Sequence, residues 1–551
     1  MTEHPSLIAH WPLSQDSRNI VTPTATTREQ DIAFAAIDSP TGPRRAAVFN
    51  GRTSFIEAGL PAGALPGDKP FTISLWLHNQ AGEGDIVGDL ISQFDPEVRR
   101  GFSLSVVSNN GVVSSPLAND RHLHFGIDNA VADNRWFDHG TPGNARSLTA
   151  LHVHDGELYA GTLELEADEA GHLYRYEGEG AWQDLGPAAD GSNCIHSLTH
   201  FNGELYAATA RYNPNGSVLG DAKNTKPGGH AYRITPDGQW IDAGHIGARG
   251  ARPDDEVVAG YATDKADDAS GLIPYKGELL AISNHRRGLW KYDGDKDWIN
   301  IGPDERLFSS TVFQGKLYTL VNGGPILRYE GDNQWTDCGK PDTSRQTYSA
   351  AIYQNELYVG TWPEGEVYRY DGDKGWLRLP RVGYEREIMG MAMYNGKMYA
   401  GTLPMANVFR MDGDWFSFVG NVDDAEVQLR RAWSMAVWNG RLFVGTLPQG
   451  RLRSYQAGAM ATVDRPLDTG WRHIAAVRDC DQLRIYIDGQ IAAASTRFSP
   501  QTFNITTDLP IRIGQGQHVT LDGALSDLRV HGKALNPQEI AAQIQNSPTQ
   551  A

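Results

Sequence analysis

Arginine recurs at one place in a set of similar segments of this chain. Ten residues before a turn position that is usually Gly stand Arg146, Arg345, Arg386 and Arg430, with Arg306 and Arg431 one residue nearer the following strand. Guanidinium groups bind carboxylate and sulfate through two parallel hydrogen bonds. In a chain with a formal net charge of −18, the repeated arginine predicts a local anion site. The alternative interpretation is pairing with glutamates of neighbouring segments, such as Glu305, Glu385 and Glu387.

Side chains that transfer protons accompany these arginines. The catalytic candidates are His196, Tyr348, His230, His245 and Tyr261, with Tyr212 beside them in the sequence pattern. The substrate-binding candidates are Arg146, Arg345, Arg386, Arg430, Arg431, Trp433 and His285, and Phe308 is a second ring on which a sugar can stack. Arg, His and Tyr together neutralise a carboxylate, remove the proton on the adjacent carbon and protonate a leaving oxygen.

Other titratable residues favour simpler roles. His154 and His200 occupy positions that hold apolar residues in sister segments, which indicates packing, whereas His152 is expected to line a channel. An acidic cluster could bind Ca²⁺ or form a solvated loop: Asp254, Asp255, Glu256, Asp264, Asp267 and Asp268. The sequence therefore predicts no firm cofactor, and Ca²⁺ is the one metal it suggests.

The elements that position these residues come from an internal repeat. Its turn falls at Gly156, Gly203, Gly277, Gly315, Asn355, Gly396 and Gly440. Most spacings run from 38 residues (Gly277 to Gly315) to 47 (Gly156 to Gly203), the length of a four-stranded propeller blade. Six residues before each turn the first strand carries only Ala, Ser or Gly, which suits strands crowded round an axis. The repeat predicts seven blades, and it is similar to kelch-type propellers.

One predicted strand is out of sequence order, which indicates how the ring closes. A fourth-strand signature beginning with Trp ends the first six repeats, and the seventh repeat lacks it. WFDHG at Trp136 stands before the first blade with no strands of its own. We therefore expect Trp136–Gly140 to complete the last blade and remove an exposed edge. Two long connections, after LYAAT and after Trp240, are each about 16 or 17 residues longer than their counterparts and are expected on one face.

The two flanks together resemble the laminin-G/concanavalin A-like family. The N-terminal flank holds LIAHWPLS and FTISLWL, and the C-terminal flank holds GWRHIAAV, IYIDGQ and ALNPQEI, in the order of that family's motifs. The resemblance implies one jelly roll into which the propeller is inserted. The predicted fold is all-β: residues 1–133 and 459–551 form the concanavalin A-like sandwich, and residues 134–458 form the seven-bladed β-propeller. Such jelly rolls commonly bind glycans; the closely spaced Glu pair of the hydrolytic families is absent.

Composition limits the partners. The acidic surface disfavours nucleic acid and anionic membranes, and no run of 18 apolar residues is present. Cys194, Cys338 and Cys480 are too few for a disulfide framework. No signal peptide is visible, so a cytoplasmic location is expected, or a secreted one if a leader was removed.

These observations predict a carbohydrate-active protein that binds an anionic, uronate-type oligo- or polysaccharide on one propeller face. One interpretation is a polysaccharide lyase, an enzyme class that uses seven-bladed propellers in several families. The alternative is a non-catalytic module that binds glycans or proteins. A third, with less support, is hydrolysis by Glu364 and Glu387.

Overall fold

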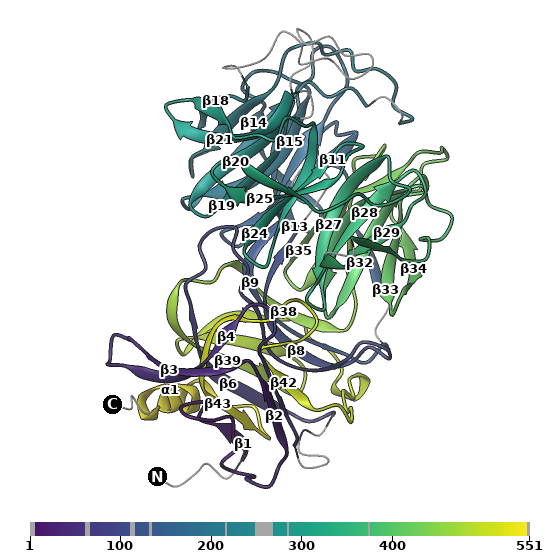
Figure 1. Ribbon diagram of the computed structural model, residues 1–551. Coiled ribbons are helices and arrows are strands. Elements are labelled where there is room, and N and C mark those ends of the chain that lie inside the picture. The colour runs from purple at the N-terminus through teal and green to yellow at the C-terminus, as the bar shows by residue number, and fades with distance from the viewer. Residues whose placement is uncertain are drawn as a thin grey trace.

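The computed structural model describes residues 6–60, 65, 67–110, 116–131, 135–214, 217–247, 268–283, 286–372 and 375–547. The described chain is almost entirely β, which confirms the predicted fold class. Figure 1 shows two bodies: a β-sandwich that carries both termini, and a propeller above it built from the middle of the chain.

Seven four-stranded antiparallel blades form the propeller, and blades one and two are joined into one sheet where Leu163 of blade one pairs with Cys194 of blade two. Blades one to three are β11 (Ser147–His154), β12 (Glu157–Leu163), β13 (His172–Gly178), β14 (Ala181–Pro187); β15 (Cys194–Phe201), β16 (Glu204–Ala210), β17 (His230–Ile234), β18 (Trp240–His245); and β19 (Ala269–Tyr275), β20 (Glu278–Ser283), β21 (Arg286–Gly294), β22 (Asp297–Asn300). Blades four and five are β23 (Leu307–Phe313), β24 (Lys316–Val321), β25 (Ile326–Gly331), β26 (Gln334–Asp337); and β27 (Gln346–Tyr353), β28 (Glu356–Trp362), β29 (Val367–Tyr370), β30 (Trp376–Arg378). Blades six and seven are β31 (Glu387–Tyr394), β32 (Lys397–Leu403), β33 (Asn407–Asp412), β34 (Trp415–Asn421); and β35 (Arg431–Trp438), β36 (Arg441–Leu447), β37 (Leu452–Gln456), β10 (Arg135–Asp138).

The first strand of each blade lies next to the axis. First strands of successive blades contact one another, and β11 contacts β35 to complete the circle. Each first strand leads into the second through two residues with positive φ, for example Asn202 (52°) and Gly203 (75°). This backbone belongs to the tight type I′ hairpin, which Asn and Gly adopt with least strain.

The out-of-order strand closes the ring as the sequence predicts. β10 pairs with β37, with Trp136 opposite Tyr455 and their rings 5.0 Å apart. The Trp136 indole nitrogen donates to Val419 O of blade six at 3.3 Å. The last blade is thus built from both ends of the propeller segment, and this pairing leaves β37 with a partner on each side.

Two sheets form the sandwich, each drawing strands from before and after the propeller. The first runs β3 (Ala33–Ile37), β4 (Arg44–Asn50), β43 (Asp522–His531), β6 (Phe71–Asn79), β39 (Gly470–Arg478), β40 (Leu483–Ile487), β41 (Gln490–Ala494), with β1 (Leu7–Trp11) paired to β43. The second runs β2 (Thr27–Gln30), β5 (Phe55–Ala58), β42 (Ile511–Ile513), β7 (Gly88–Asp95), β8 (Arg100–Asn109), β9 (Asn119–Asp128), β38 (Ala459–Pro466). One apolar core fills the space between them.

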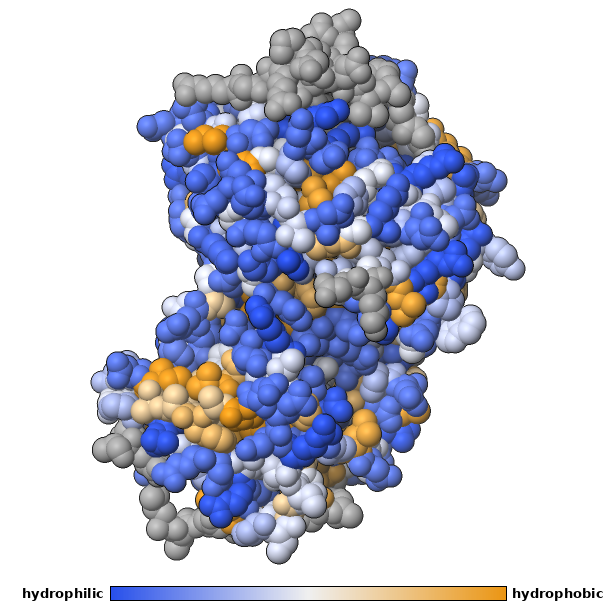
Figure 2. All heavy atoms as spheres, in the orientation of Figure 1, coloured by the Kyte–Doolittle hydropathy of each residue, from blue (hydrophilic) through white to orange (hydrophobic). Residues whose placement is uncertain are grey.

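A single α-helix follows the last strand in the described residues. α1 (Pro537–Asn546) begins with a capping box, in which Asn536 accepts from the Glu539 amide and Glu539 accepts from the Asn536 amide. Ile540 of this helix packs on Ala475, Val477 and Tyr486 of the first sheet. The apolar edge strand β3 is only partly buried, and Figure 2 shows a hydrophobic band where Figure 1 labels this strand.

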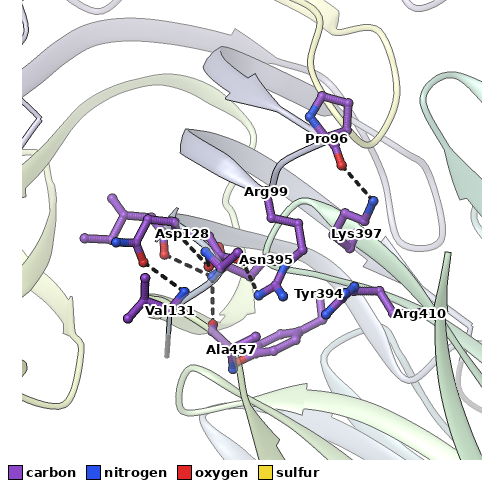
Figure 3. A network of polar contacts seen from close by, with 12 residues as sticks. Pro96, Arg99, Asp128, Val131, Tyr394, Asn395, Lys397, Arg410 and Ala457 are labelled. Carbon is purple, nitrogen blue, oxygen red and sulfur yellow. Dashed lines mark hydrogen bonds and ion pairs between the residues drawn. The ribbon is translucent and has the colours of Figure 1, made fainter. Parts of the chain in front are cut away.

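The sandwich covers one end of the propeller axis, which we call the near end. Hairpin turns of blades one, two, five, six and seven hydrogen-bond to it; the amides of Asn202 and Gly203, for example, both donate to the Glu83 carboxylate. At blade six, Asn395 donates to Ile127 O (3.1 Å) and Ala457 O (2.8 Å), beside the Arg99–Asp128 ion pair. Figure 3 shows these contacts between the two bodies.

Two asparagines fix the sandwich to the innermost strands. Asn109 donates to Met393 O (2.9 Å) and accepts from Met393 N (2.8 Å), and Asn119 makes the same pair of bonds with Val437 (2.7 and 2.9 Å). Asn109 and Asn119 end β8 and begin β9, so these ends of the two strands lie at the near end. The side-chain amides of Asn109 and Asn119 thus satisfy the backbone N–H and C=O of Met393 and Val437, as a neighbouring strand would do.

Cys194, Cys338 and Cys480 are free thiols. Within the described residues, no helix has the length and hydropathy needed to cross a membrane.

Candidate functional site

Every blade carries a β-bulge at the same point of its first strand. The register between first and second strands shifts by one residue in all seven blades. The extra residues are Thr149, His196, Ser270, Phe308, Tyr348, Met389 and Trp433, which we call the bulge ring. A bulge re-aims a side chain and is frequent next to functional sites. The ring lies toward the end of the axis away from the sandwich, the far end.

The bulge ring has an apolar half and a polar half. Phe308, Tyr348, Met389 and Trp433 of blades four to seven belong to one hydrophobic cluster, which Tyr212 and Leu219 of the β16–β17 connection join. Thr149, His196 and Ser270 of blades one to three form the other half. An aromatic wall opposite hydrogen-bonding groups is the lining that sugar rings require.

A second ring is formed by the residues that stand two positions before the bulge-ring residues in the chain, and it lies farther from the sandwich than the bulge ring does. It consists of Ser147, Cys194, Asp268, Arg306, Gln346, Glu387 and Arg431. Its members contact the bulge ring directly: the Arg431 guanidinium lies 5.2 Å from the Trp433 ring centre, and that of Arg306 lies 5.8 Å from the Phe308 ring. The guanidinium groups of Arg306 and Arg431 therefore lie against the aromatic half of the bulge ring.

His196 is oriented by a carboxylate. Its Nδ1 lies 2.8 Å from Asp268 Oδ1, and both side chains are buried. The His196 ring stacks at a tilt on Tyr212 (4.9 Å) and approaches Trp433 (6.4 Å). The carboxylate fixes the proton on Nδ1, so Nε2 presents a lone pair; Nε2 is buried and has no hydrogen-bond partner among the described residues. This is the arrangement of a general base held by an acidic residue.

Tyr348 has the opposite protonation preference. Its hydroxyl bonds to Gln346 and to the Glu387 carboxyl of the next blade. Burial, followed by the charge of Glu387, raises the pKa of Tyr348 well above its usual value. Burial also raises the pKa of Glu387, against the attraction of Arg431. Tyr348 thus keeps its proton at neutral pH and is suited to donate it.

The predicted arginines divide into two groups. Arg431 is buried, and its Nε and Nη1 have no partner within the described part of the chain. Arg430 is also buried, but its Nη1 donates to Asp423 O (2.8 Å) and Ala425 O (3.0 Å). Arg146, Arg345 and Arg386 are exposed, and Arg146 Nε donates to Pro448 O at 3.2 Å. Arg431 is therefore the arginine best placed to meet an anion at the bulge ring.

Other predicted residues lie elsewhere. His230 and His245 face each other on β17 and β18, the outer strands of blade two, with His230 also 3.3 Å from Asp242. They are thus two and three strands removed, respectively, from His196, which lies on the innermost strand. Tyr261, His285 and the acidic residues 254–267 lie outside the described residues. Asp268, grouped in the sequence with that acidic cluster, is buried against His196, and Glu364 is exposed.

A cleft of about 1000 Å³ adjoins the ring at blades one and seven. Arg146, Lys223 and Arg451 line it, together with Glu166 and Leu219. Leu219 lines this cleft and also packs against the cluster that contains Trp433, so one wall of the cleft contacts the aromatic half of the bulge ring.

Comparison with known families bears on the sandwich. A family model described as the concanavalin A-like lectin/glucanases superfamily, Laminin_G_3, matches residues 415–541. The chain carries a concanavalin A-like domain. The match begins at Trp415, which lies in blade six of the propeller. The first strand after the propeller that belongs to a sandwich sheet is β38, so the match extends beyond the sandwich on its N-terminal side. None of the curated proteins matches the chain significantly.

The chain is also similar to solved structures that match a little over half of its length. YCF48 from Cyanidioschyzon merolae is 11% identical, with 58% of this chain and 98% of that one covered and a TM-score of 0.40. The WD40 β-propeller domain of Doa1 is 12% identical, with 59% and 97% covered and a TM-score of 0.39. The computationally designed Ika8 protein is 11% identical, with 57% and 98% covered and a TM-score of 0.35.

Proposed function

We propose that the far end of the propeller binds a uronate residue of an anionic glycan and cleaves the chain by β-elimination. The observation that carries the proposal is the pairing, in one cluster, of a histidine whose free nitrogen is a base with a tyrosine that retains its proton. Phe308 and Trp433 provide faces for sugar stacking, and Arg431 provides a guanidinium for the carboxylate.

The residues account for each proton in the reaction. His196 Nε2 removes the proton on the carbon next to the carboxylate, and Asp268 stabilises the imidazolium that forms. Arg431 neutralises the charge that develops on the carboxylate. The electron pair then forms the carbon–carbon double bond while the glycosidic C–O bond breaks, and Tyr348 protonates the leaving oxygen. No water is consumed, and proton exchange with solvent restores both residues.

A panel of pectic, ulvan-like, alginate and glycosaminoglycan chains tests this proposal. The full chain should release products that carry the ultraviolet absorbance of an unsaturated uronate. His196→Asn should lower kcat by about 10²- to 10⁴-fold, because a positioned acid or base contributes that much. Arg431→Lys should raise KM for charged substrates, while the Tm of the variant stays close to that of the parent chain. Absence of unsaturated product on every substrate, or full activity of His196→Asn, would overturn it.

One observation favours binding without chemistry. His196 is only 1% exposed, so its imidazole meets a substrate only if Tyr212 or another neighbour moves. A recognition module, to which a concanavalin A-like domain is suited, predicts glycan binding with no product and an unchanged affinity in His196→Asn. The same panel, analysed for binding and for product, separates the two functions.

A further inference from the structure

A second histidine cluster lies at the near end, where the sandwich meets blades one and two. His152 and His154 belong to β11 and His200 belongs to β15. One ring nitrogen of each lies within 4.8 Å of the others. His152 and His200 are fully buried, and their ring centres are 5.3 Å apart. None of these residues takes part in the proposed elimination.

The outer nitrogens of two of these rings are bonded to groups of the sandwich. His152 Nδ1 lies 2.8 Å from Leu117 O, which can only accept, so Nδ1 carries the proton. His200 Nε2 lies 3.1 Å from Asp120 Oδ2, a buried carboxylate that Arg121 also contacts at 3.2 Å. A carbonyl or carboxylate behind the distal nitrogen is the usual support of a metal-binding histidine.

The inner nitrogens of the same two rings then face each other. His200 Nδ1 and His152 Nε2 are 3.2 Å apart. When both rings are neutral and their outer nitrogens are protonated, two lone pairs face each other across this gap, and either a shared proton or a bound metal cation relieves their repulsion. The separation matches two nitrogens on one tetrahedral zinc, about 3.3 Å for Zn–N bonds of about 2.0 Å.

The third ring completes the set and opens to solvent. The His154 ring stacks on that of His200 with centres 5.7 Å apart, and its Nδ1 is buried with no hydrogen-bond partner among the described residues. His154 also lines a cleft of about 560 Å³ between blades one and two. A metal held by three imidazoles would have a path to this cleft at its fourth position.

We propose that His152, His154 and His200 bind one divalent transition metal of the zinc class at the joint between sandwich and propeller. Three neutral imidazoles suit Zn²⁺, Co²⁺ or Cu²⁺ and not the oxygen-seeking Ca²⁺ or Mg²⁺. The supporting groups, Leu117 and Asp120, come from the sandwich, whereas the ligands come from two blades. Metal binding therefore links three segments of chain that are joined at the near end.

Sister blades supply substitutions that the fold already accepts. The equivalents of His154 are aromatic, such as Phe201, and those of His152 include Ala351, Ala392 and Ala436. His154→Phe and His152→Ala each remove one ligand and install the residue of a sister position. His230→Gln, at the outer histidine pair of blade two, is the matched control for adventitious binding by histidine.

The experiment measures metal content and affinity of the full chain after chelator treatment and return of Zn²⁺ or Co²⁺. We expect one ion per chain, visible d–d absorbance of tetrahedral Co²⁺, and a Tm that rises with Zn²⁺ but not with Ca²⁺. His154→Phe and His152→Ala should each weaken affinity at least tenfold, whereas His230→Gln leaves it unchanged. Substoichiometric binding by the parent chain, or unchanged affinity in both ligand variants, would overturn the proposal. The two ligand variants are independent of each other, so the test stands if either one folds.

Discussion

The two ends of the propeller axis use the same strands for different purposes. At the near end, the buried amides of Asn109 and Asn119 have partners for both donor and acceptor, and the hairpin turns bond to the sandwich. At the far end, His196 and Arg431 are buried with nitrogens that have no partner among the described residues. Buried polar groups are normally satisfied, so these nitrogens of His196 and Arg431 carry a cost in stability that the amides of Asn109 and Asn119 do not.

This difference separates structure from function within one repeat. Seven equivalent strands pass through both ends, and the bulge that all seven share lies toward the far end. Residues there are free to vary among Thr, His, Ser, Phe, Tyr, Met and Trp because they do not set blade geometry. The comparison predicts that near-end substitutions lower stability and that far-end substitutions lower activity.

The largest effect is expected from the two near-end asparagines. Asn109→Ala and Asn119→Ala each leave a buried N–H and C=O of a first strand unpaired, which should lower the free energy of unfolding by about 2–4 kcal/mol. The double variant should lose about twice as much, since the two sites contact different blades. Thermal and urea unfolding of the full chain measure both values.

Asn144→Ala is the control, because Asn144 bonds only to Glu169 at an exposed site. It should change stability by less than about 0.5 kcal/mol. Equal losses in Asn144→Ala and Asn119→Ala would contradict the structural role given to the near end.

The next effect concerns pH. Burial raises the pKa of Asp89 to about 7, against hydrogen bonds from Ser105, the His518 amide and neighbouring amides. The folded state therefore holds this proton more tightly than the unfolded chain, whose Asp has a pKa of about 3.9. The associated stability is fully present below about pH 4 and is lost as the pH rises to about 7. Asp89→Asn removes this titration and should be less sensitive to pH by about 2–4 kcal/mol.

Unfolding at pH 5 and pH 8 for both chains measures this difference. Burial lowers the pKa of nearby His518 to about 4, which acts in the opposite direction, so the difference between parent and variant is the relevant quantity. The exposed Asp237→Asn serves as the control. If Asp89→Asn and the parent lose stability in parallel between these pH values, Asp89 is ionised in the folded state.

The sequence predicts most of the fold because the same residue types recur at the same positions in successive blades. Small residues near the axis, positive-φ turns and fourth-strand tryptophans recur in each copy, and the missing copy at blade seven led to Trp136. The jelly-roll motifs on both flanks likewise indicated one interrupted domain. These features depend on local geometry that a residue pattern records.

The site is only partly visible in sequence. His196, Tyr348 and Trp433 were among the candidates, but nothing in one sequence marks a bulge, so their common position was missed. The His196–Asp268 contact joins two blades across a connection that is longer than its counterparts in the repeat, and pattern periodicity carries no information on it. His154 and His200 fit packing positions and His152 fits a channel-lining position, and the sandwich groups that orient His152 and His200 lie far from them in the chain.

The smallest effect gives the sharpest comparison, because the same substitution is made at each end. Tyr394, at the near end, donates to Gly440 O at 3.0 Å and accepts from Ala457 N at 3.3 Å, and it is 1% exposed. Tyr394→Phe should lower stability by about 1–3 kcal/mol and leave kcat unchanged.

Tyr348→Phe should do the reverse. The Tyr348 side chain is only partly buried, whereas that of Tyr394 is fully buried, so stability should change by less than about 1 kcal/mol. Loss of the proton donor should reduce elimination by about 10²-fold or more. Tm and product formation are measured on both variants. We expect a lower Tm with normal product formation for Tyr394→Phe, and a nearly normal Tm with reduced product formation for Tyr348→Phe. If Tyr348→Phe is the more destabilising of the two and product formation is unaffected, the Tyr348 hydroxyl stabilises the fold. That result would contradict the assignment of stability to the near end and activity to the far end.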